Sequence, residues 1–581
     1  MHKKLSLLIS LACASISVHA APQATDFIAP ELTTQVTQKT SVKSQQYMVS
    51  AANPLAVTAG YNILKAGGNA VDALVAVQTI LGLAEPQSSG LGGGGFLVYY
   101  DAHKDKLTTY DFRETAPLAA TPELFQDEHG KPLKFYDAVV GGRSVGTPGT
   151  VKLLDTVHQK YGNKKWSELL QPAIALAQNG FKVSERLASA ITNDKERLAR
   201  YPATKAYFFD PQGKPLTEGT LLKNQAYADT LSLLAKNGAD AFYLGKIAKD
   251  IVNKVNNLSD NPGVLSLKDF ANYDIIERAP TCAPYHQYDV CGMGPPSSGA
   301  LTVGQILGIS SHFDLKSMGP NDPNSWQIIG DASRLAFADR GRYMADTDFV
   351  PIPKGLLDKD YLASRAALIT KGKALESVSA GSPPWDHKIA LADDIAIEFP
   401  STSHIVITDK SGNVISMTTT VENGFGSRVM SNGFLLNNEL TDFSFVSAKN
   451  GYPIANRVEP GKRPRSSMSP TIIMKDSHPY IAIGSPGGSR IIGYVAQAII
   501  AQLDWGMDIQ DAISMPHLVN RFGTFDLEAG TAAEKFKAPL EAMGFKVSIR
   551  DLNSGIHGIV LGEGELTGGA DPRREGIVLG E

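Results

Sequence analysis

The strongest constraint on the fold of this 581-residue chain is a change of secondary-structure pattern near Thr402. Before it, long apolar or amphipathic stretches predict helices at 69–83, 149–161, 165–179, 218–257 and 326–344. After it, short runs rich in β-branched residues predict strands, namely HIVIT, VISMTT, GFLLNN, TIIMK and YIAIGS. One more helix is predicted at 490–504. Helices followed by strands and a further helix indicate helices packed on sheets, so we expect a layered α/β fold.

The composition is that of a globular protein with a sizeable core. Hydrophobic residues make up 43% of the chain and charged residues 20%, which excludes collagen-like and intrinsically disordered proteins. The formal net charge of −4, without a concentrated basic segment, argues against a nucleic-acid-binding protein. The twelve histidines are scattered, and neither HExxH nor CxxC occurs, so we expect no metal and no cofactor.

The first twenty residues have the pattern of an export signal. A positive start precedes an apolar stretch at 5–17, and the small residues of VHA favour cleavage before Ala21. The apolar stretch is too short for a membrane anchor. We therefore expect residues 21–581 to be exported to the periplasm or secreted. Residues 22–47 are polar and rich in Thr and Gln, which predicts a poorly ordered lead-in.

Two cysteines, Cys282 and Cys291, remain once the signal is removed. They flank APYHQYDV, whose aromatic and β-branched residues are typical of a short hairpin. In an oxidising compartment a disulfide between them is plausible, and two free thiols are the alternative.

Two patterns match known motifs in the wrong structural context. Residues 90–95 fit GxGxxG, but a helix precedes them and a strand follows, the reverse of the order in a nucleotide site. These glycines are better explained by close backbone packing. Residues 142–146 fit the GxSxG nucleophile elbow, but Pro148 disfavours a helix directly after the serine. Ser144 remains the candidate nucleophile of a rival function, a serine esterase.

The strongest local signal is PSTSH, at the start of a predicted β-hairpin. Its two strand-like runs flank a turn centred on Ser411, and Thr402 and Thr420 each lie nine residues from that centre. The two threonines should therefore face each other across the antiparallel pair. A cross-strand contact is the usual meaning of such a pair, and a catalytic pair of hydroxyls is the alternative.

A second signal is GSPGGSR, between a predicted strand and the helix at 490–504. Glycines at a helix N-terminus present backbone N–H groups that suit an anion. In a catalytic site these donors would stabilise a tetrahedral oxyanion. A plain strand-to-helix turn is the alternative.

These features and others spread along the mature chain resemble those of the γ-glutamyltransferases, also called γ-glutamyl transpeptidases or glutathione hydrolases. The shared segments are NPLAVTAGYNILKAGGNAVDALVA, GLGGGGF, DFRETAP, GTPG, PPSSGA, STSH, LLNNELTDFS, KRPRSSMSPT, GSPGGSRII and ADPRREG. The resemblance implies the fold of the N-terminal-nucleophile hydrolases, a four-layer αββα sandwich built jointly by two subunits of one precursor. It also implies self-cleavage between Ser401 and Thr402. The expected products are a large subunit, 21–401, and a small catalytic subunit, 402–581, which stay together as a heterodimer.

The resemblance further implies the roles of the catalytic residues. Thr402 is the expected nucleophile, activated after the cut by its own new α-amine, which titrates near neutral pH. Thr420 is expected to hydrogen-bond the nucleophile. Gly487 and Gly488 are the expected oxyanion hole.

The substrate-binding residues are implied in the same way. Arg113 matches the arginine that binds the α-carboxylate of the γ-glutamyl group, a task that suits its guanidinium fork. Ser466 and Ser467 match a serine pair at the same carboxylate, and Asp442 matches the aspartate that pairs with the substrate ammonium.

Three features depart from the common family pattern. Glu422 and Glu439 stand where many members have asparagine and glutamine. Both can still contact the amino group, and their extra negative charge predicts a preference for substrates that carry an ammonium group. The segment 443–465 is shorter than in relatives with a lid over the site, which predicts a more open site.

The implied activity is a ping-pong acyl transfer through a γ-glutamyl ester on Thr402. Glutathione is the expected donor, and water, amino acids or peptides are the expected acceptors. The nearest rival is a cephalosporin (glutaryl) acylase of the same fold. A more distant one is a non-enzymatic binding protein that keeps the fold but has lost self-cleavage.

Overall fold

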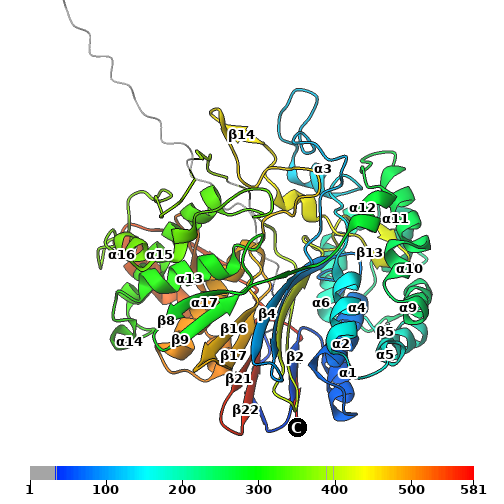
Figure 1. The fold of residues 1–581 in the computed structure, drawn as a ribbon, viewed down its shortest axis with the longest axis horizontal. Coiled ribbons are helices and arrows are strands. Elements are labelled where there is room, and N and C mark those ends of the chain that lie inside the picture. The colour runs from blue at the N-terminus through cyan, green and yellow to red at the C-terminus, as the bar shows by residue number, and fades with distance from the viewer. Residues whose placement is uncertain (1–32, 34–35, 388, 395, 397) are drawn as a thin grey trace, which may run out of the picture.

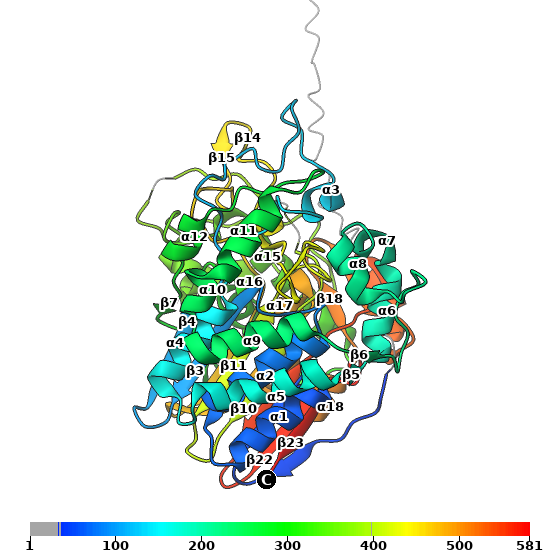
Figure 2. The same ribbon diagram turned by 90° about the vertical axis from the view of Figure 1, so that its right-hand side faces the viewer.

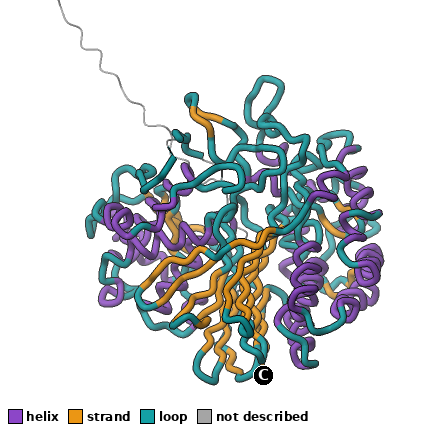
Figure 3. Tube along the Cα trace, viewed as in Figure 1, coloured by secondary structure: helices purple, strands orange, loops and turns teal. Residues whose placement is uncertain are grey.

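The computed structural model describes residues 33, 36–387, 389–394, 396 and 398–581, so the predicted export signal lies outside the described residues. Two seven-stranded sheets lie face to face, and helices cover the outer side of each (Figures 1 and 3). This is the four-layer αββα arrangement that the family resemblance implies, and it agrees with the layered α/β fold expected from the sequence pattern. The helix-rich and strand-rich parts of the chain are thus combined in one body.

The first sheet carries the predicted hairpin at its centre. Neighbouring strands are antiparallel throughout. In spatial order they are β23 (Ile577–Gly580), β2 (Met48–Ala51), β10 (Ser403–Thr408), β11 (Val414–Thr420), β3 (Gly94–Asp101), β4 (Lys106–Asp111) and β7 (Ile276–Arg278).

The second sheet is also fully antiparallel. Its spatial order is β1 (Val42–Ser44), β22 (Leu566–Ala570), β21 (His557–Leu561), β17 (His478–Gly484), β16 (Thr471–Lys475), β9 (Tyr288–Gly292) and β8 (Thr281–Tyr285). Apolar side chains from both sheets, among them Val98, Val406 and Ile472, form the buried layer between them.

The helices form two outer layers. Figure 2 faces the layer on the first sheet, which includes α1 (Pro54–Lys65), α2 (Ala70–Ala84), α4 (Thr150–Tyr161), α5 (Trp166–Asn179) and α9 (Gln225–Asn237). The layer on the second sheet includes α13 (Gly299–Ser310), α15 (Pro323–Tyr343), α17 (Ile491–Leu503) and α18 (Ile509–Ser514). Helix α2 is buried along its whole length, and its N-terminus is closed by a capping box between Asn69 and Asp72.

Shorter elements connect these layers. The helices are α3 (Phe135–Val139), α6 (Glu185–Asn193), α7 (Lys195–Leu198), α8 (Pro202–Phe208), α10 (Asp240–Tyr243), α11 (Lys246–Asn256), α12 (Leu267–Asn272), α14 (Leu315–Met318), α16 (Lys359–Ala366), α19 (Lys537–Ala542), and the 3₁₀ turns η1 (Lys354–Leu357), η2 (Glu439–Asp442), η3 (Gly488–Arg490) and η4 (Ala532–Phe536). The strands are β5 (Phe181–Lys182), β6 (Leu221–Leu222), β12 (Met430–Ser431), β13 (Phe434–Leu435), β14 (Ala448–Lys449), β15 (Tyr452–Pro453), β18 (Leu518–Asn520), β19 (Thr524–Glu528) and β20 (Lys546–Arg550).

Each sheet contains strands from both sides of the Ser401–Thr402 bond. In the first sheet, β10 and β11 come from after the bond and are enclosed by β2 and β3 from before it. In the second sheet, β16 from after the bond pairs with β9 from before it. Neither part of the chain can therefore complete a sheet alone.

Two predicted elements are wrong in extent. The helix predicted at 218–257 is interrupted, because Gly238 ends α9 with a φ of +64° and two further helices follow. The predicted strand GFLLNN contributes only the two residues of β13, because Leu436 and Asn437 instead bond to Val429 and the glycine run.

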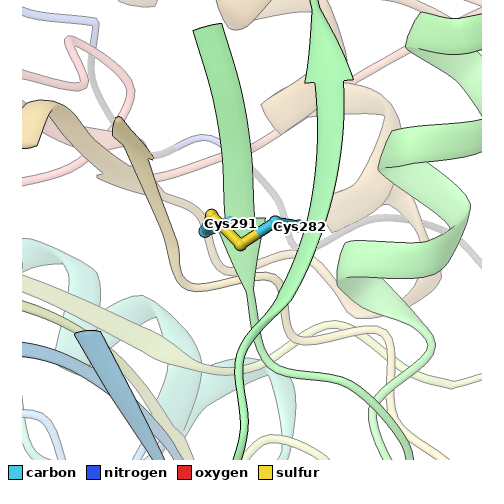
Figure 4. The surroundings of a disulfide bond; sticks show 2 residues. All are labelled: Cys282 and Cys291. Atoms are coloured by element: carbon cyan, nitrogen blue, oxygen red, sulfur yellow. A yellow bond between two sulfur atoms is a disulfide. The ribbon is translucent and has the colours of Figure 1, made fainter. Parts of the chain in front are cut away.

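The two cysteines occupy directly opposite positions in the hairpin formed by β8 and β9. Figure 4 shows the disulfide between them, with Cα atoms 4.0 Å apart. The structure therefore has the disulfide rather than the pair of free thiols.

The two misleading motifs have the structural roles that their context predicted. The glycine run lies between α2 and β3, and a Cβ on Gly93 would lie 2.0 Å from the Thr420 carbonyl oxygen. Ser144 is fully buried, and its hydroxyl donates to the Val139 carbonyl at 2.6 Å. Helix α4 begins only at Thr150, so Ser144 is not on a nucleophile elbow.

Candidate active site

The two threonines of the hairpin lie side by side. The strand register pairs Ser403 with Thr419, which brings Thr402 next to Thr420. Their Oγ1 atoms are 3.2 Å apart, and both residues are buried. The pairing predicted by counting from the turn is therefore confirmed.

Both hydroxyls lie next to the carbonyl of Ser401. Thr420 Oγ1 donates to that oxygen at 2.8 Å, and the Thr402 hydroxyl donates to the same atom. The Glu422 backbone N–H donates to Thr420 Oγ1 at 2.9 Å, which leaves the threonine proton to point at Ser401. The nucleophilic oxygen and the acyl group of the predicted cut are thus adjacent, and a neighbouring donor is in contact with the carbonyl oxygen.

The predicted oxyanion glycines lie in the turn between β17 and α17. Gly487 and Gly488 have φ values of +134° and +60°, a region that favours glycine. A Cβ on Gly488 would lie 2.7 Å from the Glu398 carbonyl oxygen and 2.8 Å from the Phe399 carbonyl group. In the uncut chain, the segment before Thr402 therefore passes directly over this turn.

Arg113 connects two segments of the candidate site. It follows β4, is buried, and forms ion pairs with Glu439 and with Asp442, the latter at 2.6 Å. Its guanidinium also donates to the backbone carbonyls of Pro464 at 3.1 Å and Arg465 at 2.8 Å. Burial alone would lower the pKa of Arg113, but the two carboxylates outweigh it and raise the pKa.

Three acidic residues, Glu422, Glu439 and Asp442, are buried close together. Burial and the neighbouring Glu439 raise the pKa of Glu422 to about 8. Burial, and then Glu422, also raise the pKa of Asp442 well above its usual range. An ammonium group in this cluster would favour the ionised form of these carboxyl groups and pair with them, so the arrangement suits a cationic ligand.

The predicted serine pair is in the site but has partners within the chain. Ser466 Oγ accepts from the Met468 N–H at 3.1 Å, and the Ser466 carbonyl accepts from Ser298 Oγ at 2.7 Å. Ser467 Oγ accepts from Arg340 at 2.8 Å, and the Ser467 N–H donates to Glu398 Oε2 at 2.6 Å.

Four residues in the site, Arg340, Glu398, Arg574 and Ser298, were not among the predicted ones. Arg340 and Glu398 contact Ser467, and Arg574 donates to the Thr402 carbonyl at 3.1 Å. Arg574 belongs to the ADPRREG segment and Ser298 to PPSSGA, so the shared segments contained a signal for both. Arg340 is one charge among several on α15, and no local pattern distinguishes it.

The segment 443–465, predicted to be shorter than a lid, forms the small hairpin of β14 and β15, which projects from the body in Figure 1. Phe445 at its base stacks on Phe125, with ring centroids 4.7 Å apart.

Within the described ranges, no helix has the length and apolar character needed to cross a membrane. The same residues contain no group of three or more potential metal ligands suitably arranged.

The comparisons with known proteins agree with this site. The family model described as gamma-glutamyltranspeptidase matches residues 56–581. A glutathione hydrolase proenzyme of Bacillus subtilis (strain 168) is 38% identical over 546 residues, covering 92% of this chain and 91% of that protein. One from Escherichia coli (strain K12) is 38% identical over 547 residues, covering 92% and 91%. A cephalosporin acylase from Bacillus halodurans has a similar structure, with a TM-score of 0.83 at 25% identity, covering 94% of this chain and 97% of that one. The fold is therefore that of the N-terminal-nucleophile hydrolases.

Proposed function

Because the chain belongs to the gamma-glutamyltranspeptidase family, we propose that it cleaves the γ-glutamyl amide of glutathione and related compounds. The acyl group passes to water, an amino acid or a peptide. The observation that carries the proposal is the pair of hydroxyls, Thr402 and Thr420, 3.2 Å apart beside the Ser401 carbonyl.

Maturation uses the same hydroxyl as catalysis. Thr402 Oγ1 attacks the Ser401 carbonyl carbon, and the acyl group moves from nitrogen to oxygen. Water then hydrolyses this ester, which leaves Ser401 with a carboxylate and Thr402 with a free amine. The expected subunits are residues 21–401 and 402–581, held together by the shared sheets.

Catalysis proceeds through a covalent ester. The Thr402 amine takes the hydroxyl proton as Oγ1 attacks the γ-amide carbon, and the N–H groups of Gly487 and Gly488 stabilise the oxyanion. The leaving amine takes the proton from the Thr402 ammonium as the amide bond breaks. Water or an acceptor amine then attacks the ester and regenerates Thr402.

Charge distinguishes a glutamyl donor from the glutaryl group of a cephalosporin. Both carry a terminal carboxylate, for which Arg113, Ser466 and Ser467 are the proposed partners. Only the glutamyl group has an ammonium as well. Asp442, Glu422 and Glu439 are buried carboxyl groups whose ionised form an ammonium would stabilise, whereas a glutaryl group offers them no cation.

The first experiment compares the intact mass of the purified protein with that of Thr402→Ala. Two wild-type masses with a junction at Thr402, and a single uncut mutant, are the expected result. A single uncut wild-type chain that binds glutamyl compounds without turnover would instead support a binding protein. The same measurement locates the N-terminus of the large subunit, which tests the proposed export signal and its cleavage before Ala21.

The second experiment compares substrates on the processed enzyme. We expect turnover of glutathione to exceed that of glutaryl-7-aminocephalosporanic acid, and the reverse order would favour the acylase. Ser144→Ala serves as the control, since its hydroxyl is bonded within the core. Loss of hydrolysis in this control, with activity retained in Thr402→Ala, would overturn the mechanism.

A further inference from the structure

The N-terminal arm, residues 36–47, runs along the last residues of the chain. The Thr37 N–H donates to the Pro572 carbonyl at 2.9 Å, and the Gln46 N–H donates to the Glu581 carbonyl at 2.6 Å. In the processed protein this arm would belong to the large subunit, and its partners would belong to the small one. The contact therefore joins the two expected subunits through residues that are distant from the cut in the sequence.

The side chain of Lys39 forms the most extensive part of this contact. Its ammonium donates to three backbone carbonyls, those of Asp571 at 2.6 Å, Arg574 at 2.7 Å and Gly576 at 2.5 Å. A lysine ammonium has three N–H donors, so all of them are used within one loop, residues 571–576. The ammonium thus holds the curvature of this loop, because three carbonyls must point at one atom.

Lys39 keeps its charge at neutral pH. Burial lowers its pKa to about 8, while Asp571 and Glu575 act in the opposite direction. The neighbouring His557 on β21 has its pKa lowered to about 3, first by burial and then by Lys39. This histidine is therefore neutral and adds no positive charge that would repel the ammonium.

The loop held by Lys39 carries Arg574, which reaches the proposed nucleophile. Arg574 Nη1 donates to the Thr402 carbonyl at 3.1 Å, and its Nε donates to Asn553 Oδ1 at 3.1 Å. Thr402 lies immediately before β10, and the pairing of β10 with β2 begins only at Ile405. The Thr402 carbonyl thus lies ahead of that ladder, and a side chain bonds it.

The Thr402 carbonyl is attached to the Cα that carries both reacting groups. After the proposed cut, this Cα would carry the free amine and the side chain whose hydroxyl attacks the donor. Because the peptide unit is planar, a hydrogen bond to the carbonyl restrains rotation about the Cα–C bond and hence the direction of the amine. A misplacement of about 1 Å in a reacting group can cost ~10²-fold in rate.

We propose that Lys39 is a positioning residue for the nucleophile: its ammonium holds the loop 571–576 so that Arg574 fixes the Thr402 carbonyl. The proposal rests on the proposed function, because it adds a residue of the expected large subunit to the support of the nucleophile on the small one. It also gives the polar N-terminal arm a role in the site.

The test measures hydrolysis of γ-glutamyl p-nitroanilide, here called the γ-glutamyl anilide, by the processed enzyme. Lys39→Met keeps a long side chain but lacks the ammonium, and we expect it to lower kcat by ~10–100-fold. KM should stay within about twofold of the wild type, since the three bonds of Lys39 go to the loop and none goes to a proposed donor-binding residue. Lys39→Arg keeps a positive charge with N–H donors and should recover part of kcat.

Lys43→Met is the matched control, because Lys43 lies on the same arm and pairs with Glu565 in an exposed salt bridge at 2.8 Å. It should keep the wild-type kcat. An unchanged kcat in Lys39→Met, or an equal loss in Lys43→Met, would refute the role of Lys39. A processed wild-type enzyme that does not cleave the anilide would refute the proposed function instead.

A double-mutant cycle tests whether Lys39 acts through Arg574. In an Arg574→Gln background, Lys39→Met should change kcat by less than about twofold, because the contact that it supports is already lost. If the losses of the two substitutions multiply in full, Lys39 acts by another route and the proposal is wrong.

These variants can fail to mature, so a further measurement uses the wild-type chain. A crystal structure of the processed enzyme should have Lys39 bonded to the three loop carbonyls, and Arg574 within hydrogen-bond distance of the Thr402 carbonyl. An Arg574 side chain turned away from Thr402 after the cut would overturn the proposal.

Discussion

The two sides of the candidate site are built by opposite means. The proposed nucleophile side consists of Thr402, immediately before β10, and Thr420, at the end of β11, in the middle of a sheet where backbone hydrogen bonds fix the register. The ligand side consists of Arg113 and a cluster of carboxylates, most of them in loops or a 3₁₀ turn. One side is neutral and positioned by the backbone, whereas the other is charged and positioned by its own ion pairs.

The difference teaches which substitutions each side tolerates. A strand keeps its register when one hydroxyl is removed, so a change there alters chemistry more than structure. Removal of one partner from a buried ion cluster leaves the other charges uncompensated, so structure and binding suffer together.

The largest effect should follow substitution on the charged side. We expect Arg113→Met to lower kcat/KM for the γ-glutamyl anilide by ~10³-fold or more, because the buried Glu439 and Asp442 then lose their cation. Its melting temperature should fall as well. Arg457→Met is the control, since this arginine is partly exposed and pairs with Glu459 at 3.2 Å. A loss below tenfold would contradict the assigned role.

On the neutral side, Thr420→Val should keep the fold and lose chemistry. Removal of the hydroxyl that donates to Ser401 at 2.8 Å should slow self-cleavage and lower kcat by ~10–100-fold, with little change in melting temperature. Thr419→Val is a close control, because the buried Thr419 hydroxyl has no hydrogen-bond partner in the described structure. Equal effects of the two substitutions would show that packing, not the hydroxyl, matters.

A smaller effect should appear in the pH dependence of stability. The pKa of Glu422 is raised to about 8, so between its ordinary pKa and pH 8 the folded state binds more protons than the unfolded state. Stability should therefore fall as pH rises through this range. We expect the melting temperature to fall between pH 5 and pH 8. In Glu422→Gln this fall should be smaller than in the wild type by about 1–4 °C. An identical decrease in both proteins would contradict the buried, protonated state of Glu422.

The smallest effect on activity is expected from the disulfide, which joins β8 to β9 at the edge of the second sheet. Replacing Cys282 and Cys291 together by serine should cost about 2–3 kcal/mol of stability, as expected for a short closed loop. We expect kcat/KM to stay within twofold of the wild type. A large loss of activity would mean that this edge affects the site.

Local patterns in the sequence were sufficient for the neutral side. The alternation of residues and the turn centred on Ser411 determine which threonines meet, and both properties are short-range. The same holds for the glycine turn at Gly487, because a positive φ favours glycine whatever surrounds it.

The charged side and the chain ends depend on distant partners, which single-sequence patterns do not specify. Arg340 meets Glu398 across 58 residues, and nothing near either residue marks the other. The polar lead-in was expected to be poorly ordered, yet residues 42–44 pair with β22 as an edge strand. That pairing needs only backbone groups, so a hydrophobic pattern does not reveal it.

The position of β10 has a consequence for the chain end that the proposed cut creates. Chain termini usually fray, because nothing restrains their last residues. A terminus made at Thr402 would begin immediately before a strand that is hydrogen-bonded on both sides, to β2 and to β11. The backbone would therefore fix the direction of its amine, and no side-chain rotamer would have to become ordered. Self-cleavage needs the folded site, so the chain must fold before it is cut. The new terminus would therefore be ordered from the moment it forms.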